Sequence, residues 1–113
     1  MYTDEEVLIL LEFAKVLTRR KSDKNISLLK YSDDAYCLIK IDGKWTILNN
    51  SKYIPCENII DALCKLINYA YIFDHSAVYQ EFDFMVKLEN AELVDKTYAQ
   101  EKRLSIYNYL SRH

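Results

Sequence analysis

The sequence predicts a single α+β domain with an N-terminal helix, a three-stranded antiparallel meander and then two or three C-terminal helices. Two observations predict this class. Apolar residues recur at helical spacing near both ends of the chain, and short strand-like runs around an Asp-Gly dipeptide lie between them. A chain of 113 residues with one Gly and one Pro has the length of one domain and no linker. We therefore expect residues 1–113 to fold around one core.

The first helix is predicted over residues 4–20. Thr3 followed by Glu6 has the pattern of a capping box, and acidic residues fill the first turn, where they suit the helix dipole. Apolar residues then recur at helical spacing as far as Leu17. A basic cluster follows, which we interpret as favourable charge at the helix C-terminus rather than as a phosphate-binding site: Arg19, Arg20, Lys21 and Lys24.

The dipeptide Asp42-Gly43 predicts the central hairpin. Asp-Gly between two strand-like runs is typical of a two-residue type I′ turn, in which φ is positive. We expect strands at 26–31, 35–41 and 44–49, with a turn at 32–34. The short loop fixes the register, and directly opposed residues share a sheet face. One face then carries Tyr36, Leu38, Lys40, Trp45 and Ile47, and the other carries Cys37, Ile39, Ile41, Thr46 and Leu48.

Three more helices are predicted at 57–72, 76–89 and 97–111, after a turn or loop at 49–52. In the first of them, Asp61 and Lys65 form an i,i+4 pair in the favourable order. The segment Asp74-His75-Ser76 interrupts the apolar pattern and can cap the next helix.

Composition narrows the classes of function. Half of the residues are apolar, so the chain can bury enough surface to fold. A net charge of −2 provides no general basic field for nucleic acid. The longest apolar run, Val7–Leu11, is far shorter than the ~20 residues of a membrane span, and the acidic N-terminus is unlike a signal peptide. We expect a cytoplasmic protein that binds neither nucleic acid nor membrane.

The sequence offers little for catalysis or metal binding. Cys37, Cys56 and Cys64 have no CxxC spacing, which predicts free thiols rather than a zinc site. Cys56 and His75 could pair as nucleophile and base, but a helix-capping role for His75 is the better interpretation. The adjacent acids at 33–34 are best explained as a solvated turn. We expect a protein that is not an enzyme and that holds neither metal nor cofactor. An enzyme that depends on a thiol or a histidine is the third hypothesis for its function.

Residues 74–95 form an acidic segment, with six acids against Lys87 alone and a net charge of −5. Aromatic residues interleave with these charges. Exposed together, they would attract a basic partner through electrostatic steering and anchor it through the rings. The alternative is a solvated amphipathic helix with its aromatics in the core. The partner-binding residues predicted here are Tyr79, Glu81, Asp83, Glu89, Glu92 and Asp95.

Ten tyrosines in 113 residues favour a binding protein, because Tyr is enriched at interfaces. Tyr107 and Tyr109 fall on different faces of one predicted helix, as do Tyr69 and Tyr71, so some of these rings must be near the surface. The alternative is compositional drift, since an AT-rich genome also favours Tyr, Lys, Ile and Asn.

The stretch 36–47, which contains Asp42-Gly43-Lys44-Trp45, is followed by the helical sequence Asn58-Ile59-Ile60-Asp61-Ala62-Leu63. Over residues 27–72 this order resembles small bacterial immunity proteins, which bind and block polymorphic toxins. The resemblance implies a cytoplasmic immunity protein that inhibits a cognate toxin stoichiometrically. The alternative is a small regulatory or adaptor protein, of the kind that phages encode, which binds a host protein or another copy of itself.

Overall fold

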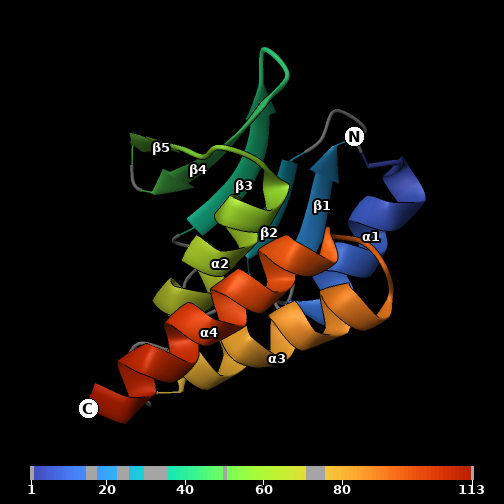
Figure 1. Cartoon of the computed structure of the whole chain (residues 1–113). Helices are drawn as coiled ribbons and strands as arrows, with labels where there is room; N and C mark the ends of the chain where they lie inside the picture. The colour runs from blue at the N-terminus through green and yellow to red at the C-terminus, as the bar shows by residue number, and fades with distance from the viewer. Residues whose placement is uncertain are drawn as a thin grey trace.

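The computed structural model describes residues 2–14, 18–22, 26–29, 36–49, 51–70 and 76–112 (Figure 1). In these ranges the predicted α+β class is confirmed. The helices are α1 (Asp4–Phe13), α2 (Ile59–Ala70), α3 (Ala77–Asn90) and α4 (Lys96–Arg112). The strands are β1 (Thr18–Ser22), β2 (Ile26–Leu29), β3 (Tyr36–Ile41), β4 (Lys44–Asn49) and β5 (Lys52–Pro55).

The strands form one five-stranded antiparallel sheet in the order β1-β2-β3-β4-β5. The predicted three-stranded meander is its centre, β2-β3-β4. The sequence interpretation missed both edge strands. In particular, Lys52 was assigned to a turn or loop but begins β5, where it pairs with Asn49 after a turn at Ser51.

The predicted first helix is correct at its start and wrong at its end. The capping box is present: Thr3 Oγ1 accepts from the Glu6 amide at 3.1 Å, and Glu6 accepts from the Thr3 amide at 2.9 Å. The helix ends at Phe13, however, and 18–22 form β1 against β2. Arg19, Arg20 and Lys21 therefore belong to a strand and not to a helix C-terminus, because pairing with β2 outweighs local helical spacing. Lys24 lies outside the described residues.

The hairpin prediction is confirmed in its turn and its register. Asp42 and Gly43 have φ values of 50° and 79°, as a type I′ turn requires. Lys40 pairs with Trp45 and Leu38 with Ile47. The turn predicted at 32–34, with Asp33 and Asp34, lies outside the described residues.

The core lies on the Leu38–Ile47 face of the sheet. Leu38 and Ile47 are fully buried there, and α2 packs on this side. Figure 1 shows α2 between the sheet and the α3–α4 pair, in keeping with its contacts to β4 and α3. On the opposite face Thr46 is buried and donates its hydroxyl to the Lys44 carbonyl at 3.4 Å, whereas Ile41 is 40% exposed.

The three C-terminal helices confirm the predicted order. α2 begins two residues later than expected, because the Asn58 side chain caps it by accepting from the Asp61 amide at 2.8 Å. The predicted Asp61–Lys65 ion pair is present at 3.1 Å. Residues 71–75, including His75, lie outside the described part of the chain. None of the described helices combines the length and the apolar character needed to cross a membrane.

Candidate binding cleft

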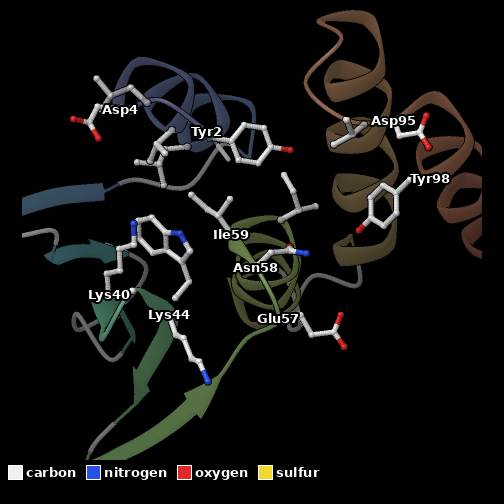
Figure 2. A pocket seen from close by; sticks show the side chains of 16 residues that line it. Tyr2, Asp4, Lys40, Lys44, Glu57, Asn58, Ile59, Asp95 and Tyr98 are labelled. Atoms are coloured by element: carbon white, nitrogen blue, oxygen red, sulfur yellow. The ribbon is translucent and has the colours of Figure 1, made fainter.

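A cleft of about 900 Å³ opens between α1, the β3–β4 hairpin, the start of α2 and the segment that joins α3 to α4 (Figure 2). Its lining is apolar and aromatic in the middle and charged at the rim. The volume is in the range of sites that receive a small molecule or an inserted peptide segment. The lining residues used below are Tyr2, Asp4, Leu8, Lys40, Lys44, Trp45, Glu57, Asn58, Asp95 and Tyr98.

The hairpin contributes Trp45 and Lys40, which the register places opposite one another on the core-facing side. The Lys40 ammonium lies 5.4 Å from the centroid of the Trp45 ring, a cation–π contact. Trp45 is half-buried and packs against the core cluster. Because the tight turn fixes both strands, this wall of the cleft is set by local sequence.

Tyr2 links the start of the chain to the segment that joins α3 to α4. Its hydroxyl donates to the Leu93 carbonyl at 2.6 Å, a contact between residues 91 positions apart. Burial raises the pKa of Tyr2, and the nearby Glu6 carboxylate raises it further. The phenol therefore stays protonated, and able to donate, beyond the pH range in which a free tyrosine does.

The carbonyl that receives this bond is oriented by the C-terminal turn of α3. The Leu93 amide donates to Leu88 and the Glu92 amide to Glu89, each at 3.0 Å, which is the hydrogen-bond pattern of a Schellman motif. Glu92 occupies the left-handed position of this motif, with a φ of 57°. The turn redirects the chain so that Val94 and Asp95 line the cleft.

Tyr98, on the first turns of α4, forms the far wall. Burial raises its pKa, and the nearby carboxylates of Asp61 and Glu81 add to the shift. The Lys102 ammonium lies 5.8 Å from the centroid of the Tyr98 ring. Figure 2 shows Tyr2, Ile59 and Tyr98 around the same space, although they come from three separate elements.

The rim of the cleft carries charges of both signs. Exposed Lys40 and Lys44 stand on the hairpin side, and Figure 2 shows Asp95 on the opposite side. Asp4 and Glu57 are the other exposed acids of the rim.

The predicted acidic residues on α3 do not share one surface. Tyr79 is 62% exposed, and Asp83, one turn further along, pairs with Lys87 at 3.1 Å. Glu81 lies about 160° around the helix from Tyr79. There it accepts from Asn68 Nδ2 of α2 at 3.1 Å.

The remaining members of the predicted set are equally dispersed. Glu89 is bound by Arg103 of α4, which leaves its side chain 17% exposed. Glu92 is exposed at the turn after α3, and Asp95 reaches the rim of the cleft. Of the interleaved aromatics, Phe84 is in the core. The structure therefore brings one of the six predicted residues, Asp95, to the cleft.

Sequence reasoning missed the aromatic lining, that is Tyr2, Trp45 and Tyr98. Trp45 could have been recognised, because the predicted register already paired it with Lys40 on the face that also carries Leu38. Tyr2 and Tyr98 carried no such signal, because only the tertiary fold brings the start of the chain to the segment that joins α3 to α4.

The structure describes the thiols of two cysteines, Cys56 and Cys64. Cys56 and Cys64 are free, as predicted, and Cys64 is buried. Burial raises the pKa of both, so neither is activated as a thiolate at neutral pH. Within the described ranges, no three His, Cys, Asp or Glu side chains gather in a way that could hold a metal ion.

Comparison of the chain with protein-family models, with curated proteins and with solved structures found no match.

Proposed function

We propose that this protein works by stoichiometric binding of a partner protein in the cytoplasm, and that it is an immunity protein whose cognate partner is a bacterial toxin. The observation that carries the binding role is the cleft of about 900 Å³, which has an aromatic and apolar centre and a charged rim. Apolar anchors at the centre and polar contacts at the edge are the usual anatomy of a protein-binding surface. The choice of a toxin as partner rests on the resemblance of residues 27–72.

The cleft would receive a projecting segment of the partner. Leu8 is the most accessible apolar side chain of its lining, 62% exposed on the outer turn of α1. Lys44 at the hairpin tip and Asp95 at the opposite rim would orient the incoming segment. Blocking a toxin in this way requires no chemistry, only a complex that forms faster than the toxin acts.

The first experiment is co-expression with the toxin domain of any neighbouring gene, scored by growth and by co-purification. The informative variant is Leu8→Glu, which puts a charge into the cleft at an exposed position and so spares the fold. Its matched control is Ile9→Glu, at the next residue of α1, which is also exposed but does not line the cleft. We expect wild type and Ile9→Glu to rescue growth and co-purify, and Leu8→Glu to lose about tenfold or more in affinity.

Two results would contradict the proposal in different ways. If toxicity persists and no complex forms with wild type, the immunity role is wrong. If a complex forms and Leu8→Glu binds as well as Ile9→Glu, the cleft is not the binding surface. A partner without toxicity, captured through the cleft, would favour the adaptor alternative.

A further inference from the structure

The outer face of α4 is exposed along its length although it carries large apolar side chains. Ala99 and Ile106 face the interior, and α4 contacts α3 on that side. On the far side, Leu104 is 59% exposed and Tyr109 is 52% exposed. Both line a shallow hollow whose other residues are Glu101, Ser105, Asn108 and Arg112.

These residues form a seam with the spacing of a helix-pairing surface. Glu101, Ser105, Asn108 and Arg112 follow one another at intervals of four, three and four residues, so that at about 100° per residue they share one stripe. Leu104 and Tyr109 border this stripe on its two sides. The stripe points away from the face that holds Ala99 and Ile106, so packing in the monomer leaves it accessible.

The order of residues along the seam is complementary to itself. It begins with an acid, Glu101, and ends with a base, Arg112, and the two polar residues Ser105 and Asn108 lie symmetrically between them. When two such helices lie antiparallel about a two-fold axis, each Glu101 is level with the other copy's Arg112. In a parallel pair, like charges would meet instead.

We propose that the Glu101–Arg112 face of α4 binds a second copy of this chain in an antiparallel, two-fold symmetric dimer. Two Glu101–Arg112 ion pairs close the ends of the contact, and the paired Leu104 and paired Tyr109 side chains flank it. This arrangement is isologous, so it closes at two copies and does not grow into a filament. The cleft and the Glu101–Arg112 face share no residue, so the dimer contact does not use the lining of the cleft.

One helix face is smaller than the ~800 Å² per partner of a standard stable interface. The dimer is therefore expected to be concentration-dependent, and to be populated in the upper part of a series from about 1 µM to about 1 mM. Sedimentation velocity over this series, at low salt, measures the dissociation constant directly.

Charge reversal gives the decisive test. Glu101→Arg alone places two arginines level at each end, and Arg112→Glu alone places two glutamates there. Each variant should weaken self-association by about tenfold, since two attractive contacts become repulsive. Mixed in equal amounts, the two variants restore both opposite-charge pairs, so the mixture should sediment as a heterodimer with an affinity close to that of wild type. Gln100→Arg is the control, since it adds a charge to α4 beside the seam.

This pattern distinguishes the antiparallel dimer from the other outcomes. A wild-type chain that stays monomeric at every concentration overturns the proposal. Dimers that persist in both single variants, or a mixture that fails to recover, show that a different surface joins the copies. Circular dichroism of each variant confirms that the fold is retained before the sedimentation result is interpreted.

Discussion

The helices α2 and α4 belong to one domain but differ in how much of their surface they bury. α2 has 12 residues, and Leu63, Leu66 and Ile67 are completely buried. α4 has 17 residues, of which Ala99 and Ile106 are buried. The core therefore draws on α2 far more than on α4, whose side chains are largely accessible. The length of a helix therefore does not indicate how much it contributes to the free energy of unfolding.

Replacing the same residue type in both helices is the strongest test of this contrast. Leu63→Ala should destabilise the protein by about 2–5 kcal/mol, because it leaves a cavity in the core. Leu104→Ala should change the free energy of unfolding by about 0.5 kcal/mol or less, since its side chain is largely in solvent. Urea denaturation of both variants measures the difference. Equal losses would show that α4 is as deeply integrated as α2.

Gly43, at the tip of the hairpin, tests whether a substitution at an exposed position can still lower the stability of the fold. Gly43 has no neighbouring atom within 4 Å of an added Cβ, so a side chain meets no steric barrier there. Its φ of 79° is nevertheless unfavourable for a β-branched residue. We expect Gly43→Val to lower stability by about 1–2 kcal/mol, and Gly43→Asn, which tolerates positive φ, to lose less. An unchanged melting temperature in Gly43→Val would contradict this explanation.

Tyr2→Phe tests the contact between the start of the chain and the turn after α3. Removing the hydroxyl that donates to Leu93 should cost about 1 kcal/mol. The same variant has a pH signature. Because the folded-state pKa of Tyr2 is raised, the unfolded chain loses its phenol proton first, and stability is full below pH ~10 and falls as the pH rises further. The variant should therefore lose less stability than wild type as the pH rises on the alkaline side. Part of the pH dependence should remain, because the pKa of Tyr98 is raised as well. If the stability of the variant and of wild type depended on pH in the same way, this explanation would be contradicted.

The smallest effect is expected for the surface ion pair on α3. Lys87→Gln removes the contact with Asp83, and both side chains are partly exposed. Pairs of this kind contribute about 0.3–0.5 kcal/mol. Chemical denaturation at low and high salt should show a small difference that disappears at high salt. A loss above about 1 kcal/mol would mean that Lys87 has a further structural role.

The parts of the fold that could be predicted are those controlled by neighbouring residues. The Thr3 cap, the Asp42-Gly43 turn and the Lys40–Trp45 register each depend on a few adjacent side chains. The error at Arg19 and Arg20 has another origin. Their conformation depends on backbone pairing with β2, the next strand along the chain, and apolar residues at helical spacing do not report such pairing.

The candidate site was less predictable for the same reason. The cleft joins Tyr2, Trp45 and Tyr98, which are remote from one another in the chain. The acidic segment stood out because its charges are adjacent in sequence, but helical geometry turns Glu81 and Glu89 toward other helices. Charge counted along a chain predicts a surface only when the helix face of each residue is considered.

The edge strand β5 has a consequence for the behaviour of the protein at high concentration. An open sheet edge can pair with the edge of another molecule and begin aggregation. The amide of Cys56 points inward to Trp45, so by strand alternation the nitrogen of Pro55 points outward, where it has no hydrogen to donate. By the same alternation the Tyr53 amide points outward, so this short strand, which begins with the charged Lys52, offers an added strand one backbone donor. Replacing Pro55 would therefore expose a growth point for β-aggregation without disturbing the ladder to β4.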